Sequence, residues 1–201
     1  MPICSSFRVL DLGPYYNNDG ISTDENRADG DFTGAGVTYP AEDLPPSYAR
    51  VEYGGVAFRF PSKLDGLDNN VSLEAQAVPV YPGLYSALHV LGSGEDSLED
   101  IVHFVGEDGN THEPTLALSA WHRGNSLLYG ELQAIVCTGY HHSSGHIATS
   151  HLGVCYGIWM QSVRIRTSTR LVSIRLPDNP GMHIFAMTLA RGPAGTREVN
   201  R

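Results

Sequence analysis

Apolar and polar residues alternate in two runs, near 130–141 and 151–164, on either side of a tip rich in serine, glycine and histidine. Alternation with a period of two is typical of a β-strand that has one buried face. The two runs therefore predict an antiparallel hairpin with one face in a hydrophobic core. The expected core face is made of apolar side chains: Leu132, Val136, Leu152, Val154 and Ile158.

The opposite face of this hairpin carries glycine, histidine, tryptophan, glutamine and glutamate. A register symmetric about His146 places four pairs across the hairpin: Cys137 with Cys155, His141 with His151, Gly139 with Gly153, and Gln133 with Trp159. Glycines on one face leave room for a ligand, so this face is interpreted as the floor of a groove. The alternative is a solvated sheet face with scattered histidines.

The rest of the chain reads as short strands separated by turn residues, without helical periodicity over three turns. Pro45–Pro46, Gly54–Gly55 and Pro82–Gly83 interrupt it. About ten strands of this kind predict an all-β protein, a single jelly-roll-like antiparallel β-sandwich domain over residues 1–201, with a frayed tail near 191–201. The strands are expected at 6–12, 50–53, 56–60, 71–80, 85–91, 100–105, 115–118, 170–176 and 182–189, besides the hairpin.

The composition is that of an ordinary globular protein, with 17% charged and 41% apolar residues in 201. A net charge of −9 argues against nucleic acid and anionic membranes as partners. No signal peptide and no membrane-spanning run is visible, which predicts a cytoplasmic protein with reduced thiols. Only the register above would allow a Cys137–Cys155 bridge. The oligomeric state stays open, a homo-oligomer included.

Residues 15–36 form a long loop rich in asparagine, aspartate and glycine. Such loops offer the oxygen ligands that Ca²⁺ takes, although the spacing does not match an EF-hand. The alternative is a set of Asx turns that close on themselves. The candidate ligands of a structural calcium ion are Asn18, Asp19, Asp24, Asp29 and Asp31.

Cys137, Cys155, His141 and His151 are ligand types that zinc binds. Residues four apart on a strand are separated by about 13 Å, however, whereas bonds to zinc are about 2.0–2.3 Å long. One ion therefore cannot take all four side chains. A site of two or three histidines at the tip stays open.

Histidine is suited to acid/base catalysis, and a pair across a hairpin supplies one acid and one base. His141 and His151 are the expected pair, and His142 and Glu131 are further catalytic candidates. The sequence lacks a Gly-x-Ser-x-Gly elbow, a P-loop and a dinucleotide fingerprint, so redox chemistry and nucleotide phosphoryl transfer are not expected. Two glycosidase carboxylates cannot be picked out.

Binding without chemistry is the competing interpretation, because sugars are recognised by aromatic stacking and a few placed polar groups. The candidate ligand-binding residues are Trp121, His122, Gln133, Tyr140, Trp159 and Gln161. The other histidines are expected to be structural, hydrogen-bonded residues: His89, His103, His112 and His183.

Several phrases together resemble the accessory carbohydrate-binding-like β-sandwich modules of bacterial glycoside hydrolases, notably of the fucosidase type: YYNNDGIS, ADGDFTGAGVTYPAEDLP, GGVAFRFP, DNNV, YSALHVLG and MHIFAMTLA. The resemblance covers about residues 7–190. It implies a jelly-roll sandwich, a carbohydrate-binding role and often a structural calcium ion. It carries over no catalytic motif. The chain differs in its density of histidine in the late hairpin, and it is expected to be free-standing, with no hydrolase attached.

An accessory module works by being tethered to an enzyme, an advantage that a free-standing copy lacks. We therefore expect a small-molecule-binding β-sandwich that acts as a cofactor-independent enzyme of metabolite biosynthesis. Histidine acid/base chemistry would make it a cyclase, lyase, isomerase or hydrolase of a hydroxylated or glycosylated metabolite. The alternative is a carbohydrate-binding module or lectin-like protein without catalysis, because a fold does not decide a function.

Overall fold

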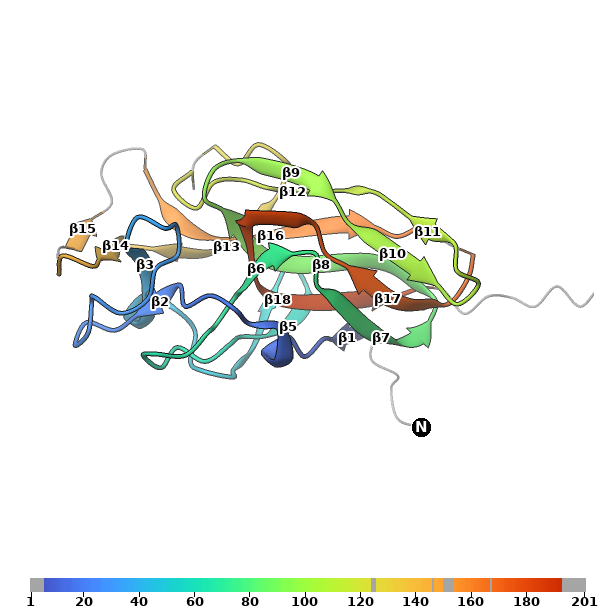
Figure 1. Cartoon of the computed structure of the whole chain (residues 1–201), viewed down its shortest axis with the longest axis horizontal. Coiled ribbons are helices and arrows are strands. Elements are labelled where there is room, and N and C mark those ends of the chain that lie inside the picture. Colours follow the sequence, from blue (N-terminus) through green and yellow to red (C-terminus); the bar gives the residue numbers. More distant parts are fainter. Residues whose placement is uncertain (1–5, 124–125, 146, 150–153, 167, 193–201) are drawn as a thin grey trace, which may run out of the picture.

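The six-stranded sheet at the centre of the molecule is covered on both of its faces (Figure 1). The computed structural model describes residues 6–123, 126–145, 147–149, 154–166 and 168–192. The strand order in the central sheet is β1-β18-β8-β16-β13, and β6 pairs with β18. Its strands are β1 (Phe7–Val9), β6 (Val71–Glu74), β8 (Tyr85–Gly94), β13 (Leu132–Cys137), β16 (Tyr156–Arg164) and β18 (Asp178–Arg191).

Four smaller sheets pack around or extend from this sheet. One is β7 (Ala77–Gly83), β10 (His103–Gly106), β11 (Thr111–His112) and β17 (Leu171–Arg175), and a second is β9 (Leu98–Ile101) with β12 (Thr115–Leu118). The third is β2 (Ile21–Ser22), β3 (Val37–Pro40), β14 (Gly139–His142) and β15 (Ile147–Thr149), and the fourth is β4 (Arg50–Tyr53) with β5 (Val56–Arg59). Two 3₁₀ turns complete the elements, η1 (Gly13–Tyr15) and η2 (Ala41–Asp43).

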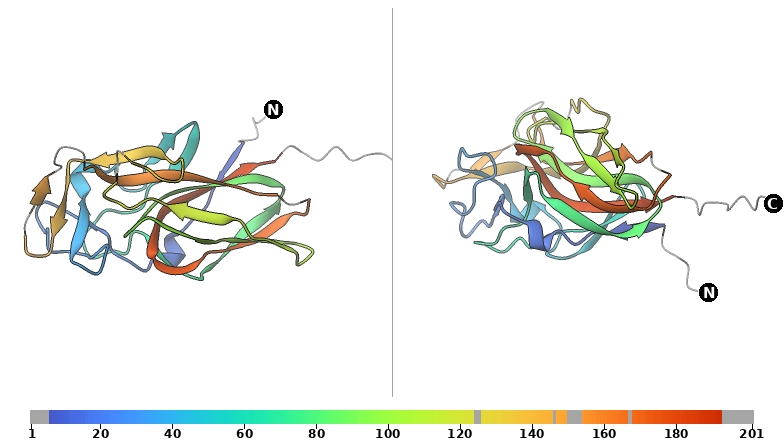
Figure 2. Two further views of the ribbon diagram at one scale, coloured as in Figure 1. Left: turned by 90° about the horizontal axis from the view of Figure 1, so that it is seen from above. Right: turned by 45° about the vertical axis from the view of Figure 1, so that its right-hand side comes forward.

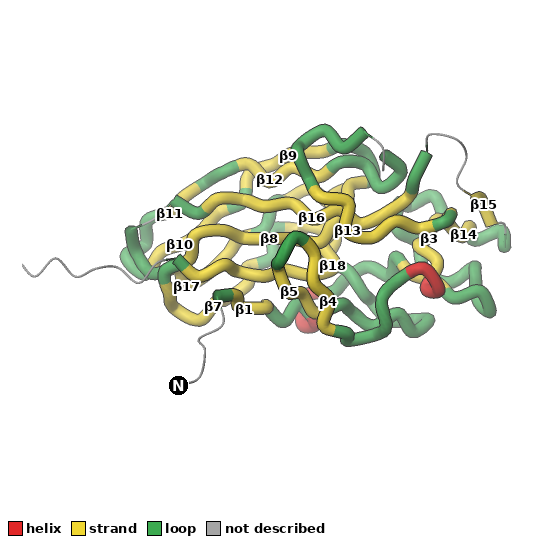
Figure 3. Tube along the Cα trace, turned by 180° about the vertical axis from the view of Figure 1, so that it is seen from behind, coloured by secondary structure: helices red, strands yellow, loops and turns green. Residues whose placement is uncertain are grey.

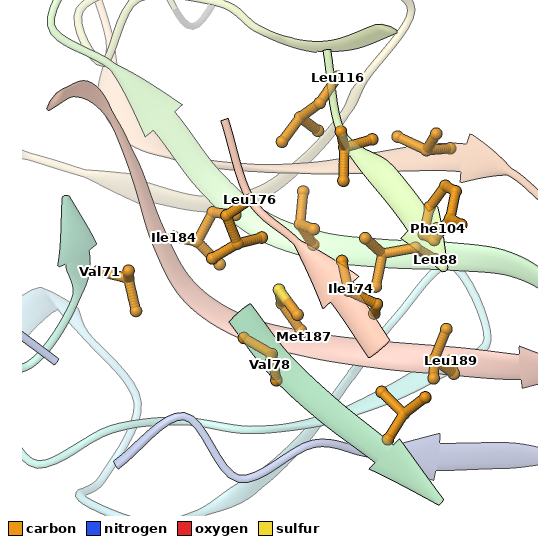
Figure 4. Close-up of a cluster of buried hydrophobic side chains, with 14 of the residues drawn as sticks. Val71, Val78, Leu88, Phe104, Leu116, Ile174, Leu176, Ile184, Met187 and Leu189 are labelled. Carbon is orange, nitrogen blue, oxygen red and sulfur yellow. The ribbon is translucent and has the colours of Figure 1, made fainter. Parts of the chain in front are cut away.

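Strand β18 shows why this sheet needs cover on two sides. Residues 182–189 are all buried, so the strand does not alternate between core and solvent. Met187 and Leu189 belong to the core cluster under β10 and β17 (Figure 4), whereas Phe185 packs on the other side against Phe60 of the loop after β5. Figure 3 shows the β4–β5 hairpin lying across the second face. The antiparallel β-sandwich predicted from the turn-separated strands is confirmed.

The predicted late hairpin is correct in part. β13 and β16 pair antiparallel, and Gln133 lies opposite Trp159 as expected. A register shift between Gln133 and Ile135 then places Cys137 opposite Tyr156, not Cys155. The register that suggested a cysteine bridge is therefore not formed.

The chain leaves the central sheet after Cys137, and β14 joins a different sheet. There Gly139 lies opposite Thr149, not Gly153, and His141 lies opposite Ile147 on one side and Thr38 on the other. The predicted pairing of His141 with His151 is wrong. Leu152, Gly153 and His151 lie outside the described residues.

The predicted faces are wrong for β13, whereas Ile158 of β16 is buried as predicted. Ile135 and Cys137 are buried, whereas Leu132 and Val136 are 43% and 48% exposed. The register shift near Ala134 changes which side chains point inward, and β13 is the edge strand of its sheet. On β16, Ile158 and Trp159 are both buried because both faces of the central sheet are covered.

The small sheet that contains β14 lies at one end of the molecule, as two perpendicular views show (Figures 1 and 2). It joins four segments that are far apart in the sequence: β2 and β3 from the early part of the chain, and β14 and β15 from the late part. The long loop rich in asparagine and aspartate contains β2, and its residues 23–36 connect β2 to β3 at the same end. Within the described residues, no helix is long and apolar enough to cross a membrane.

Candidate functional site

His141 is buried in the small sheet at this end, with 2% of its surface exposed. Its Nδ1 lies 2.9 Å from Ser22 Oγ, and Ser22 Oγ lies 2.6 Å from Thr38 Oγ1. Ser22 and Thr38 are fully or almost fully buried. The three side chains meet because β14 pairs with β3, and β3 pairs with β2. Two hydroxyl groups therefore fix the orientation of the imidazole ring.

The opposite nitrogen of the same ring faces a carboxylate. His141 Nε2 lies 3.5 Å from Asp24 Oδ1. Arg27 donates two hydrogen bonds to that oxygen, from Nε at 3.1 Å and from Nη2 at 2.8 Å. The guanidinium of Arg27 lowers the pKa of Asp24, and the neighbouring His141 acts in the same direction. Asp24 is therefore an anion that favours a proton on Nε2 of His141.

This geometry gives a hydrogen-bond chain one preferred direction. With a proton on Nε2, the Nδ1 atom of neutral His141 accepts from the hydroxyl of Ser22, and Ser22 accepts from Thr38. The set of residue types resembles a catalytic triad, but the roles differ. Ser22 is fully buried and already bonded to Thr38, so it orients the ring and cannot serve as a nucleophile.

Glu42 completes the cluster from η2. Its Oε1 accepts a hydrogen bond of 3.0 Å from the backbone N–H of Asp24. One donor atom each from Asp24, Glu42 and His141 lies within 4.8 Å of the other two, a spacing that could hold a divalent ion. Arg27 already places a positive charge on the Asp24 oxygen that faces His141. This charge would repel a metal ion and favours a site for proton transfer instead.

A pocket of about 160 Å³ opens beside these groups. Asp43 anchors its wall, because its Oδ2 accepts hydrogen bonds from the backbone N–H and the hydroxyl of Thr138 at 2.7 and 2.8 Å. The pocket is smaller than the roughly 300–1,000 Å³ of sites for drug-sized ligands, so it suits one polar group of a larger molecule. It is lined by Asp24, Pro40, Glu42, Asp43, Thr138, Gly139, His141 and Ile147.

The family follows from a match over nearly the whole chain. The family model for the AziU2-like beta-sandwich domain matches residues 6–193, which span every element described above. The chain belongs to the AziU2-like beta-sandwich domain family. A search of curated proteins finds no match. The β-sandwich implied by the resemblance to glycoside hydrolase modules is thus confirmed, whereas a link to glycoside hydrolases is not shown.

Among the catalytic candidates that the structure of this AziU2-like domain describes, only His141 lines the pocket. His142 faces away and caps a turn, with Nδ1 2.9 Å from Ser144 Oγ. The Glu131 carboxylate accepts hydrogen bonds from Ser119 and from the backbone N–H of Tyr129, which fixes a loop. His151 lies outside the described residues.

The ligand-binding candidates divide into two groups. Trp121 packs with Tyr140 and His122, with ring centroids 5.4 and 5.7 Å apart. Trp159 is fully buried and its Nε1 donates to Ala120 O, so it does not floor a groove. Gln133 is exposed, and Gln161 donates to the carbonyls of Ala117 and Tyr129.

The structure does not bring the five candidate calcium ligands to one point. Asp24 faces His141, whereas Asp31 Oδ1 accepts from the backbone N–H groups of Thr33 and Gly36, as an Asx turn does. Asp29 Oδ2 accepts from the N–H of Gly66. The half-buried Asp19 and Asn18 accept hydrogen bonds from the side-chain amides of Asn69 and Asn70. Calcium binding by this loop stays a prediction.

Sequence reasoning missed Ser22, Thr38 and Glu42. Ser22 stands in a two-residue strand, which is too short to show alternation. Thr38 and Glu42 belong to a segment, TYPAEDL, that reads as a loop interrupted by proline. The sequence offers one local signal for this position, a serine that directly follows an apolar residue in Gly20-Ile21-Ser22.

Proposed function

We propose that this AziU2-like domain is a small-molecule-binding protein whose working site is the His141 pocket. It acts there as a cofactor-independent acid/base enzyme on a hydroxylated or glycosylated metabolite. The observation that carries the proposal is the two-sided fixing of His141. Buried hydroxyls hold Nδ1, and Nε2 is turned toward two carboxylates at a pocket. A structural histidine needs no such opening.

His141 and Glu42 provide the two proton-transfer groups. His141 presents an N–H to the pocket and Glu42 presents a carboxylate oxygen, with the atoms of the cluster within 4.8 Å of each other. One group can deliver a proton to a substrate while the other removes one. Glu42 takes the part that was expected of His151. For His141 to act as the acid, its ring must carry both protons, and Asp24 stabilises that imidazolium. When Nε2 gives its proton to the substrate, the neutral ring keeps the proton on Nδ1, and Ser22 Oγ accepts it in a hydrogen bond.

This chemistry fits cyclisation, elimination, isomerisation or hydrolysis, because each needs an acid and a base without electron transfer. A hydroxyl group has the polarity and the size for the small acidic pocket. The competing function is glycan binding without turnover. The half-buried Trp121, with Tyr140 and His122 beside it, favours that function.

Incubation with a panel of sugars, sugar lactones and hydroxy acids, followed by mass spectrometry, tests the proposal. The wild-type protein is expected to convert at least one compound, and His141→Gln is expected to lower the rate by about 100-fold or more. His142→Gln is the matched control, since its side chain only caps a turn. Equal turnover in His141→Gln and wild type would remove His141 from the chemistry. Loss of turnover in EDTA would show that the reaction needs a metal.

A further inference from the structure

A second buried histidine ends a chain of side-chain hydrogen bonds through the interior. Asn69 Nδ2 donates to Asp19 Oδ1 at 2.5 Å, and Asn70 Nδ2 donates to Asn69 Oδ1 at 3.1 Å. Asn70 Oδ1 in turn lies 2.9 Å from His183 Nδ1. Asn69 and Asn70 are fully buried, and His183 is 2% exposed. The chain therefore links the loop at Asp19 to β18.

Backbone partners fix the direction of this chain. Asn69 Oδ1 accepts the backbone N–H of Gly20 at 3.0 Å, which identifies that atom as the oxygen. Asn70 Nδ2 donates to the carbonyl oxygen of Asn18 at 3.1 Å, which identifies it as the nitrogen. The oxygen of Asn70 thus faces Nδ1 of His183, and this ring nitrogen must carry a proton.

The other ring nitrogen of His183 is buried and has no hydrogen-bond partner among the residues that the structure describes. The carboxylate atom Glu95 Oε1 lies 3.6 Å from it. Because Nδ1 already carries the proton of a neutral ring, Nε2 would face the carboxylate as a second acceptor. A buried acceptor turned toward another acceptor is costly, and one added proton removes that cost.

We infer that the His183 ring carries a second proton in the folded protein, on Nε2 facing Glu95, and that this proton holds β18 to the segment after β8 at the end of the hydrogen-bond chain from Asp19. Phe32 of the asparagine-rich loop lies on the His183 ring, with centroids 4.3 Å apart. The loop also carries Asp24, which lines the His141 pocket, and Arg27, which donates to Asp24, but the inference does not depend on the role of His141.

Few charged groups face this site in the described part of the chain. Glu95 approaches from the end of β8, and Asp19 is connected through Asn69 and Asn70. The strands that pair with β18 place Ser72 and Ser93 opposite His183, and neither is charged. Burial and the nearby Asp29 and Asp68 raise the pKa of Asp19 to about 6, so Asp19 titrates as well. A substitution of Glu95 removes the carboxylate that faces His183 and leaves Asp19 unchanged. It therefore separates the effect of the His183 proton from that of Asp19.

Glu95→Gln is the informative variant. Its amide N–H can donate to Nε2 of a neutral His183, so the need for the extra proton disappears while the shape is kept. Nuclear magnetic resonance of ¹⁵N-labelled histidine rings reports the protonation of each nitrogen directly. In the wild-type chain both ring nitrogens of His183 are expected to carry a proton at pH 6. In Glu95→Gln only Nδ1 is expected to be protonated at neutral pH.

Glu113→Gln supplies the matched control, because Glu113 forms an exposed pair with His103 at 3.2 Å. Glu113→Gln should leave the His183 signals unchanged.

Thermal unfolding in EDTA adds a second measurement. Between pH 6 and pH 9, the wild-type Tm is expected to fall relative to that of Glu95→Gln by about 2–4 °C, since loss of the proton leaves a buried acceptor unpaired. A neutral His183 ring at pH 6 in the wild type, or a constant Tm difference, would overturn the inference.

Discussion

His141 and Ser22 are 119 residues apart in the chain, yet Nδ1 and Oγ of the two side chains lie 2.9 Å apart in the interior. Two-residue β2 brings Ser22 to this position, and its pairing with β3 adds Thr38. The imidazole is thus held from its buried side. Its other nitrogen is left to face Asp24 and the pocket.

Ser22→Ala tests whether this hydroxyl positions the His141 ring for the proposed acid/base reaction. Removal of Oγ leaves Nδ1 of His141 and the hydroxyl of Thr38 without their shared partner. We expect turnover to fall by about 10- to 100-fold with little change in KM, because the ring loses its orientation. The free energy of unfolding should fall by about 1–3 kcal/mol.

A change of pH profile distinguishes positioning from a general loss of structure. Ser22→Ala should shift the pH dependence of kcat, because the tautomer of His141 is no longer fixed. Ser144→Ala removes a hydroxyl that touches only the turn at His142, and it serves as the control. A Ser22→Ala protein with wild-type kcat at every pH would show that the Ser22 hydrogen bond does not matter to the reaction.

Arg27→Met tests the charge of Asp24. The guanidinium of Arg27 holds the pKa of Asp24 below its ordinary value, so its loss moves that pKa upward. Asp24 then becomes protonated at a higher pH than in the wild type. We expect the acid side of the pH–rate profile to shift to higher pH, with little change at neutral pH. Arg50→Met, at an exposed arginine on β4, should leave the profile unchanged.

Trp159 and Trp121 are expected to respond in different ways to truncation. Trp159 is fully buried and bonded to Ala120 O, so Trp159→Ala should cost about 3–5 kcal/mol of unfolding free energy, which denaturant titration measures. Trp121 is half-buried, and Trp121→Ala should weaken binding to a glycan array if the ring cluster binds sugars. Unchanged array binding by Trp121→Ala would count against the glycan function.

Local patterns predicted the fold well where turns and strands are adjacent in sequence. The strand-turn-strand expected around Gly54 and Gly55 forms between Arg50–Tyr53 and Val56–Arg59. Both glycines adopt positive φ, at 56° and 77°, as a two-residue hairpin turn requires. The type of the fold follows from repeated local signals of this kind.

The same patterns could not predict the candidate site. Alternation identifies the buried face of a strand only when the opposite face is in solvent, and the central sheet is covered on both sides. Ile158 and Trp159 are therefore both buried. On the edge strand β13, the register shift near Ala134 exchanges the faces expected of Ile135 and Val136. The contact between His141 and Ser22 depends on a sheet that joins distant segments, and no local periodicity records it. The phrases YYNNDGIS, DNNV and MHIFAMTLA, by contrast, meet in one network from Asn18 to His183.

Asp19→Asn is expected to stabilise the protein above pH 6. Burial, and then the charges of Asp29 and Asp68, raise the pKa of Asp19 from 3.8 to about 6. The folded chain thus holds this proton more tightly than the unfolded chain, so the stability that the group contributes is fully present below pH 3.8. That stability is lost as the pH rises toward 6. After discounting for solvent screening of a half-buried group, the loss is about 1–2 kcal/mol.

The asparagine oxygen of Asp19→Asn can still accept from Asn69, but its amide does not ionise. Denaturant unfolding in EDTA should therefore show the variant to be more stable than wild type by about 1–2 kcal/mol at pH 7.5, and equally stable near pH 4. Asp108→Asn, at a carboxylate whose pKa is lowered by its hydrogen bond from Asn110, should show no gain at pH 7.5. Repeating the wild-type titration with CaCl₂ tests the calcium prediction, since a bound ion would abolish the penalty by neutralising Asp19. A stability difference between variant and wild type that does not change with pH would show that Asp19 stays ionised in the fold.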